Sequence, residues 1–180
     1  MSYFMPILTK STIRNKIIEH SRNDEPWFPY YNFIAKPVPY ELLEEDPFFK
    51  WLSSRYKYIG GIIKVDPYTT YDWHIDTRRG VGINMILSPQ SPTLSKCLFK
   101  VYRNEATTKF TQLIYEPDVY YIFNTQIEHM VLNLKKPRYM LSVEFLKDKD
   151  ELTYAQLCQD IKDNYEKNCT KRCNRRLVTK

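Results

Sequence analysis

The chain has 180 residues, of which 43% are hydrophobic and 27% are charged, a composition typical of one folded domain and unlike that of a disordered segment. No apolar run approaches the roughly 20 residues that span a bilayer, and the first residues lack the regions of a signal peptide, so we expect no membrane attachment. The four cysteines show no C-x-x-C spacing, which favours free thiols in a reducing cytoplasm.

The net charge of +6 comes from the end of the chain. Residues 167–180 hold six basic and no acidic side chains, and 21 basic and 21 acidic residues remain in 1–166. A basic tail can bind polyanions weakly, but such tails are more often only solvated. Nucleic acid is therefore an alternative partner that we do not favour. Cys169 and Cys173 in this tail lack the second pair that a zinc site needs.

The N-terminal part, residues 1–54, is predicted to be helical and rich in proline and aromatic residues. Residues 10–22 place isoleucines at helical spacing. Residues 24–39 contain four prolines, too many for a helix or a central strand, and their aromatic neighbours favour an extended segment packed on the core. A second helical pattern covers 40–54 and is interrupted or started by Pro47.

From residue 56 onward the pattern changes to short strands separated by turn residues. The candidate strands are 56–65, 71–76, 81–88, 97–103, 111–115, 119–123, 129–134 and 138–146. This number of short strands with polar connections predicts a sandwich, a barrel or a jelly roll. Residues 151–167 predict a C-terminal helix, followed by the basic tail at 168–180. We therefore expect a single α+β domain over 1–180, with a strand core at 56–146 and helices flanking it at both ends.

Two of these strands combine an apolar face with a face that carries polar groups. In the last strand the apolar side chains alternate with a second set, Arg138, Met140, Ser142 and Glu144. In the strand at 81–88, Asn84 lies opposite the apolar face formed by Val81, Ile83, Met85 and Leu87. Strands that direct polar groups away from their apolar faces predict a polar cavity inside a double sheet.

The tripeptide His74-Ile75-Asp76 carries the clearest chemical signal. In an extended strand His74 and Asp76 share a face, and His129 can add a second imidazole from a distant strand. Two histidines and one carboxylate hold Fe(II) while leaving coordination positions open. Arg138, nine residues after His129, supplies a guanidinium that can bind a carboxylate through two parallel hydrogen bonds.

The segments Tyr71–Asp76 and His129–Asn133, followed by Arg138, resemble the 2-oxoglutarate- and Fe(II)-dependent dioxygenases. They are most similar to the prolyl and aspartyl/asparaginyl hydroxylase branches of that superfamily. The resemblance covers residues 56–146 and implies a double-stranded β-helix, or jelly roll, with the metal at one mouth. It implies that His74, Asp76 and His129 are iron ligands and that Arg138 binds the distal carboxylate of 2-oxoglutarate.

The resemblance also implies a co-substrate pocket lined by Tyr71, Asn84 and Ser142. The expected reaction hydroxylates a prolyl, aspartyl or asparaginyl side chain of a protein, or a small amino-acid-like substrate, and releases succinate and CO₂. Arg78 and Arg79, just past Asp76, either attract an acidic substrate or form a simple polar turn.

Two other classes stay open at this point. The first is a jelly-roll binding or structural module without working iron, and the second is a cupin-like metal enzyme that uses Zn(II) or Mn(II) without 2-oxoglutarate. The presence of the complete triad disfavours the first, and Arg138 at its spacing disfavours the second. The residue pattern predicts neither an oligomeric state nor a host, although the bias toward Lys, Asn and Tyr is compatible with an AT-rich viral or bacterial genome.

Overall fold

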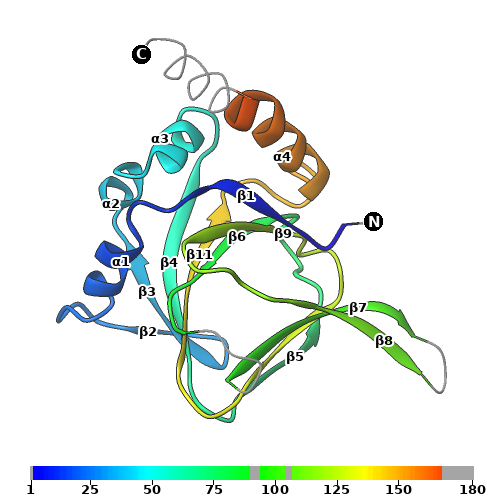
Figure 1. Cartoon of the computed structure of the whole chain (residues 1–180). Helices are drawn as coiled ribbons and strands as arrows, with labels where there is room; N and C mark the ends of the chain where they lie inside the picture. The colour runs from blue at the N-terminus through cyan, green and yellow to red at the C-terminus, as the bar shows by residue number, and fades with distance from the viewer. Residues whose placement is uncertain (1, 90–93, 104–106, 168–180) are drawn as a thin grey trace, which may run out of the picture.

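The computed structural model describes residues 2–89, 94–103 and 107–167, which form two antiparallel sheets with helices on one side (Figure 1). The seven-stranded sheet has the order β1 (Phe4–Lys10), β9 (Val119–Phe123), β6 (Gly82–Ile86), β11 (Arg138–Phe145), β4 (Tyr58–Val65), β3 (Phe33–Val38) and β2 (Phe28–Tyr30). The four-stranded sheet has the order β5 (Thr70–His74), β10 (His129–Asn133), β7 (Ser95–Arg103) and β8 (Thr108–Leu113).

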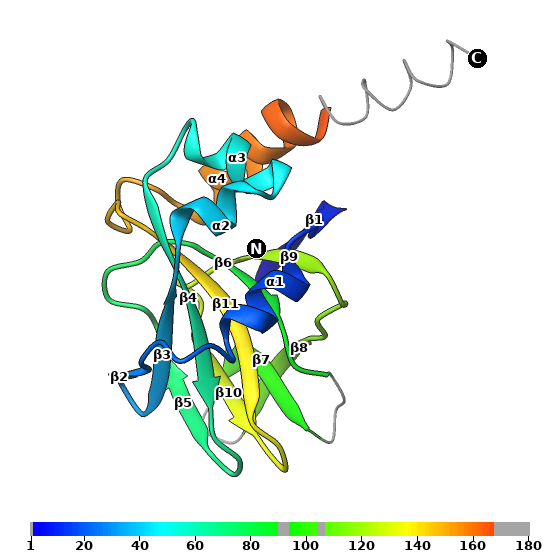
Figure 2. The ribbon, with the colours of Figure 1, turned by 90° about the vertical axis from the view of Figure 1, so that its left-hand side faces the viewer.

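The helices cover the outer face of the seven-stranded sheet (Figure 2). They are α1 (Arg14–His20), α2 (Tyr40–Glu44), α3 (Pro47–Ser53) and α4 (Tyr154–Asp160), which continues as the π-helical segment η1 (Ile161–Glu166). Asp46 accepts a hydrogen bond from the backbone N–H of Phe48 and so caps α3, while Pro47 at the first helical position lacks the N–H that would be unpaired there. Thr153 and Gln156 form a capping box at the start of α4.

The core has two layers, one on each face of the seven-stranded sheet. The layer under the helices contains the apolar sets of β6 and β11 together with buried residues of α3, α4 and η1. The layer between the sheets contains Met140 and Ile86 from the opposite faces of the same strands. The alternation predicted for these two strands is therefore confirmed, and their second faces point into the space between the sheets.

The eight strands expected after residue 56 are all present as β4 to β11, as are helices within the three segments predicted to be helical. The N-terminal part differs from expectation because it also supplies three strands. β1 lies at one end of the large sheet, and β2 and β3 form a hairpin at the other end. Within the described residues, no helix combines the length and the apolar composition needed to cross a membrane.

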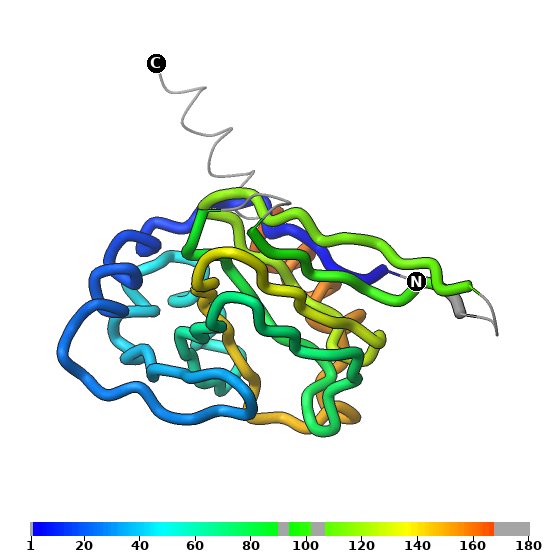
Figure 3. Tube along the Cα trace, turned by 90° about the horizontal axis from the view of Figure 1, so that it is seen from below, coloured from blue at the N-terminus to red at the C-terminus, as the bar shows by residue number. Residues whose placement is uncertain are grey.

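The view from below shows α1 and the hairpin of β2 and β3 on one side of the barrel, opposite the hairpin of β7 and β8, which projects away from it, while β1 starts beside that projecting hairpin (Figure 3). The hairpin of β2 and β3 is tied to the small sheet as well, because Asn32 Nδ2 donates to the carbonyl oxygen of Thr70 at 3.1 Å. The edges of the two sheets are thereby linked on the side where β5 begins. Residues 168–180, including Cys169 and Cys173, lie outside the described residues.

Candidate active site

A cavity of about 700 Å³ lies between the two sheets. Its lining includes all seven residues that the sequence singled out: Tyr71, His74, Asp76, Asn84, His129, Arg138 and Ser142. These residues come from β5, β6, β10 and β11 and from the loop after β5, so the fold assembles them from both sheets. The polar cavity predicted from the strand alternation is present.

His74, Asp76 and His129 converge at one end of this cavity. His74 and His129 stand directly opposite each other on β5 and β10, and their ring centroids are 4.2 Å apart. One ligand atom from each of the three residues lies within 4.8 Å of the others. His74 Nε2 and Asp76 Oδ1 are 3.7 Å apart, a separation that one ion at about 2.1 Å from each atom would bridge.

Both imidazoles are oriented for metal binding by their second nitrogen. His74 Nδ1 is 2.6 Å from the carbonyl oxygen of Asp72, and His129 Nδ1 is 2.8 Å from that of Ile127. A carbonyl only accepts hydrogen bonds, so each Nδ1 carries the proton and each Nε2 keeps its lone pair. Burial lowers the pKa of His129 well below its usual range, which keeps this imidazole neutral at pH 7.

Asp76 lies beyond the end of β5, whereas the sequence placed it inside a strand. Its position depends on the segment after β9 instead. The N–H of Asp76 donates to the carbonyl oxygen of Thr125 at 3.1 Å, and Gln126 Nε2 donates to the carbonyl oxygens of Asp76 and Arg79 at 2.9 and 2.7 Å. Arg79 binds Asp76 Oδ2 through Nε at 2.8 Å and Nη2 at 2.7 Å, which leaves Oδ1 on the side of His74.

Gly80 fixes the other side of this loop. A Cβ atom at this position would lie 2.5 Å from the carbonyl oxygen of Leu152 and 2.8 Å from that of Lys149. The N–H of Lys149 also donates to the carbonyl oxygen of Arg78 at 2.7 Å. The loop that carries Asp76 is therefore packed against the backbone of the segment leading into α4, an approach that a side chain at Gly80 would prevent.

Arg138 is the first residue of β11 and lies at the other end of the cavity from His74, Asp76 and His129. It is buried, with 3% of its surface exposed. It forms no ion pair with any described residue; its guanidinium lies 5.6 Å from the Tyr115 ring centroid and 3.5 Å from Met140 Sδ. Burial also raises the pKa of the Tyr115 phenol, which therefore stays a neutral hydrogen-bond donor beside this cation. A buried guanidinium that lacks an acidic partner is suited to bind a carboxylate ligand.

Asn84 provides a second polar group without a partner. Its Oδ1 is buried in the cavity and accepts no hydrogen bond from any described residue. Buried polar atoms are usually paired, so this oxygen indicates a position where a bound molecule completes the hydrogen bonding. Together with the free Nε2 atoms and Arg138, the residues present fit both a metal ion and an acidic co-substrate.

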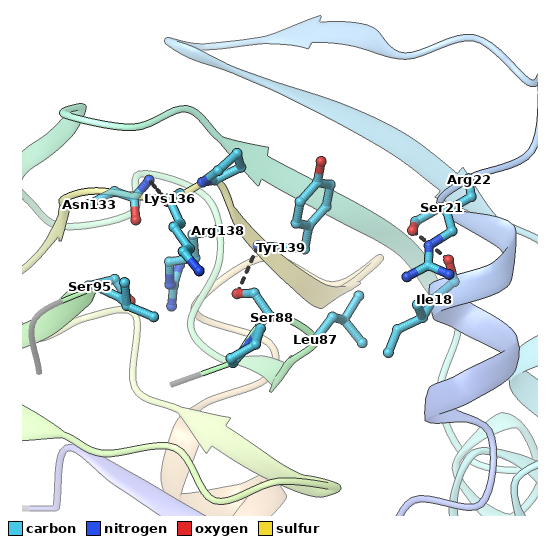
Figure 4. A pocket seen from close by; sticks show the side chains of 13 residues that line it. Ile18, Ser21, Arg22, Leu87, Ser88, Ser95, Asn133, Lys136, Arg138 and Tyr139 are labelled. Atoms are coloured by element: carbon cyan, nitrogen blue, oxygen red, sulfur yellow. Dashed lines mark hydrogen bonds between the residues drawn. The ribbon is translucent and has the colours of Figure 1, made fainter. Parts of the chain in front are cut away.

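A second cavity of about 410 Å³ lies on the other side of Arg138, between α1 and the ends of β6 and β10 (Figure 4). Arg138 lines both cavities. The start of its strand is held by Ser88 Oγ, which accepts from the N–H of Tyr139 at 3.2 Å. Asn133 Nδ2 donates to the carbonyl oxygens of Val65, Asp66 and Lys136 at 2.7 to 3.1 Å, which ties together the turns around Arg138.

Sequence reasoning missed three contributors to this site. Tyr115 is one of 15 tyrosines and has no motif around it, and Gln126 sits in an ordinary polar turn. Arg79 was predicted to attract an acidic substrate or to belong to a simple polar turn, and its contact with Asp76 was not foreseen. Each of these roles depends on a contact between segments far apart in the sequence, so no local pattern could reveal it.

The fold is shared with solved structures of 2-oxoglutarate oxygenases. A prolyl hydroxylase from Trichoplax adhaerens, in complex with a hypoxia inducible factor peptide, matches with a TM-score of 0.61 and 14% identity over 82% of this chain and 83% of that one. A Pseudomonas putida prolyl-4-hydroxylase matches with a TM-score of 0.56 and 16% identity over 75% and 85%. HygX from Streptomyces hygroscopicus, with nickel, 2-oxoglutarate and hygromycin B bound, matches with a TM-score of 0.56 and 10% identity over 79% and 81%.

No family model matches the sequence, and no curated protein matches it either. The similarity therefore lies in the three-dimensional arrangement. The chain has the double-stranded β-helix fold of the 2-oxoglutarate- and Fe(II)-dependent oxygenases, prolyl hydroxylases among them, as the resemblance of its motifs implied.

Proposed function

We propose that this protein is an Fe(II)- and 2-oxoglutarate-dependent oxygenase that hydroxylates a peptide side chain or a small amino-acid-like substrate. The observation that carries the proposal is the convergence of three ligand atoms within 4.8 Å at one end of a cavity whose other end holds a buried, unpaired arginine. The shared fold supports the same assignment, since HygX binds 2-oxoglutarate and a metal.

In this proposal His74, Asp76 and His129 hold the metal. The carbonyl oxygens of Asp72 and Ile127 fix the imidazole tautomers, and Arg79 orients Asp76. Arg138 binds the distal carboxylate of 2-oxoglutarate, with the Tyr115 hydroxyl beside it as a further donor. Asn84, Ser142 and Tyr71 line the space between the two ends.

Bound Fe(II) and 2-oxoglutarate supply the oxidation, in which a C–H bond, O₂ and 2-oxoglutarate yield the alcohol, succinate and CO₂. The protein positions the substrate beside the metal and keeps water from the reacting centre. Both tasks suit a cavity whose walls include Phe33, Tyr71 and Phe123. We assign residues 1–180 to a single domain of this kind, and the free, buried Cys97 and Cys158 favour a reducing compartment such as the cytoplasm.

The test measures succinate formed from 2-oxoglutarate with Fe(II) and O₂ present, and it compares Asp76→Asn with Asp72→Asn. Both variants remove one carboxylate charge from the same segment, but Asp72 is exposed and, among the described residues, its carboxylate accepts only from the N–H of Trp73, while its backbone carbonyl beside His74 is kept in Asp72→Asn. We expect turnover in the wild type and in Asp72→Asn, and its loss in Asp76→Asn and His74→Ala. Turnover that survives in Asp76→Asn and His74→Ala would contradict the metal assignment.

The two alternatives predict different results in the same assay. A jelly-roll binding module shows no 2-oxoglutarate consumption in any variant, even when Fe(II) is bound. A cupin-like metal enzyme without 2-oxoglutarate retains its activity in Arg138→Ala, because nothing in its chemistry uses that guanidinium.

A further inference from the structure

Glu144 is an acidic side chain in the cavity that the proposed chemistry leaves unused. It lies on the β11 face that also carries Arg138, Met140 and Ser142, and it is half-buried. With about 3.4 Å per residue, it stands about 20 Å along the strand from Arg138. Glu144 on β11 is the sheet partner of Gly82 on β6, and Gly82 is also the sheet partner of Phe123 on β9. The ring of Phe123 lies 4.8 Å from that of His129. Glu144 is therefore at the metal end of the cavity.

No described residue forms a hydrogen bond or an ion pair with the Glu144 carboxylate. The positive charge of Arg79 acts on Glu144, but the two contacts of its guanidinium go to Asp76 Oδ2. Arg78 also lines the cavity, but it is exposed to solvent, where its charge remains hydrated. The carboxylate is consequently available to a molecule that enters beside the metal.

An aromatic wall, formed by Tyr30, Tyr31, Phe33 and Tyr71, stands over the same end of the cavity. Successive ring centroids are 4.9 Å apart for Tyr30 and Tyr31, 6.2 Å for Tyr31 and Tyr71, and 5.3 Å for Phe33 and Tyr71. Tyr71 in turn lies 3.9 Å from the ring of His74. The wall thus runs from the β2–β3 hairpin to a proposed metal ligand.

Tyr31 holds an exposed aromatic ring at the tip of this wall. It is 76% exposed and has a φ of 53°, a conformation that a residue with a side chain rarely adopts. The hairpin keeps this turn because Asn32 is anchored to Thr70 on β5. A large exposed ring in such a conformation costs free energy without contributing to the core, which is typical of a residue retained for binding.

Tyr30 connects the wall to the acidic group. Burial raises the pKa of the Tyr30 phenol, the positive charge of Arg79 opposes this rise, and the negative charge of Glu144 adds to it. Tyr30, Arg79 and Glu144 therefore lie close enough to act on one another. A carboxylate next to the π-faces of tyrosines is the environment that stabilises an organic cation, and the ring faces also pack against an alkyl chain.

A neutral or acidic substrate would be poorly suited to this place. It would displace water from a half-buried carboxylate without offering a countercharge, and that desolvation weakens binding. We infer that the substrate of the proposed hydroxylation carries an ammonium or guanidinium group, which binds Glu144 while its alkyl chain packs on the aromatic wall. This inference rests on the proposed function, since the position of the cation is defined relative to the metal.

The experiment titrates peptides into protein loaded with Mn(II) and 2-oxoglutarate under anaerobic conditions, and measures affinity by calorimetry. The probes are N-acetyl-Gly-Lys-Gly-amide, its arginine counterpart, and the norleucine analogue, which keeps the alkyl chain and lacks the charge. The binding of Mn(II) and of 2-oxoglutarate is measured with the same protein preparations before the peptides are added. The variants are Glu144→Gln, Tyr31→Ala and, as a matched loss of one exposed carboxylate on α2, Glu41→Gln.

We expect at least one cationic peptide to bind about 10-fold or more tightly than the norleucine peptide, a difference typical of one partly buried charge pair. Glu144→Gln should remove that preference, Tyr31→Ala should weaken all peptides several-fold, and Glu41→Gln should change nothing. Equal binding of all three peptides, or a preference that survives in Glu144→Gln, overturns the inference while the proposed function stands. Failure of Mn(II) and 2-oxoglutarate to bind contradicts the proposed function itself and, with it, the inference.

Discussion

Replacing Arg138 by methionine separates its role in binding from any role in folding. Arg138 is 3% exposed and lacks an acidic partner among the described residues, and its guanidinium lies over the ring of Tyr115 and beside the thioether of Met140. Methionine has a similar length and no charge, so it removes a buried charge at little cost in packing. The lost cation–π contact costs about 1–2 kcal/mol, and relief of the desolvation penalty offsets about 1–4 kcal/mol.

We therefore expect the free energy of unfolding of the metal-free Arg138→Met variant to lie between about 1 kcal/mol below and about 3 kcal/mol above that of the wild type. The affinity for 2-oxoglutarate should fall instead. Loss of one partner from a buried carboxylate–guanidinium pair costs about 2–5 kcal/mol, which corresponds to about 30-fold to 4,000-fold in Kd. The substitution therefore has a small effect on stability and a large effect on co-substrate binding.

The assay combines urea denaturation of the metal-free protein with calorimetric titration of 2-oxoglutarate into the Mn(II)-loaded protein. Lys136→Met is the matched control, since Lys136 is an exposed cation two residues away that lines only the second cavity of the two. It should leave both quantities unchanged. Unchanged 2-oxoglutarate affinity in Arg138→Met, or a large loss of stability, would refute the reasoning.

Three further changes test the loop and the imidazoles that surround the proposed metal. Gly80→Ala places a Cβ 2.5 Å from a backbone oxygen and should destabilise the fold by about 1–3 kcal/mol in urea denaturation, whereas Gly61→Ala meets its nearest atom at 3.5 Å and should cost less. Gln126→Ala removes two hydrogen bonds to the Asp76 loop and should weaken Mn(II) binding about 10- to 100-fold in titrations, with urea denaturation showing less than about 2 kcal/mol of change. Burial lowers the pKa of His129, so as the pH falls the unfolded chain binds a proton at this residue before the folded chain does. The contribution of neutral His129 to the free energy of unfolding is therefore complete above about pH 6.5 and declines as the pH falls below that value. His129→Gln should flatten this decline in a pH series of unfolding curves, and an unchanged slope would contradict it.

The strands from β4 to β11 were predictable because each combines alternating side chains with turn residues at its ends. The N-terminal strands were not, because their sequences contain prolines that argue against pairing. Pro6 is accommodated because β1 pairs only with β9 and is an edge strand. Pro37 is accommodated because β2 pairs with Phe33–Ala35 only, so nothing on that side requires an N–H from Pro37.

The candidate site, like the strands, was predictable from the sequence only in part. The family resemblance carried by His74, Asp76, His129 and Arg138 implied that these residues share one site, and all four line the same cavity. The strand that was expected to orient Asp76 ends at His74, and the orientation comes from Thr125, Gln126 and Arg79 instead. Such contacts follow from how the sheet brings distant segments together, which local residue patterns do not encode.

The most direct test of whether this cavity binds Fe(II) and 2-oxoglutarate together is the anaerobic addition of Fe(II) to the protein in the presence of 2-oxoglutarate, followed by visible absorption. We expect a weak charge-transfer band in the wild type that is absent in His129→Ala and strongly reduced in Arg138→Met at limiting 2-oxoglutarate. Absence of the band in wild-type protein that demonstrably contains iron would contradict the claim that this cavity binds Fe(II) and 2-oxoglutarate together.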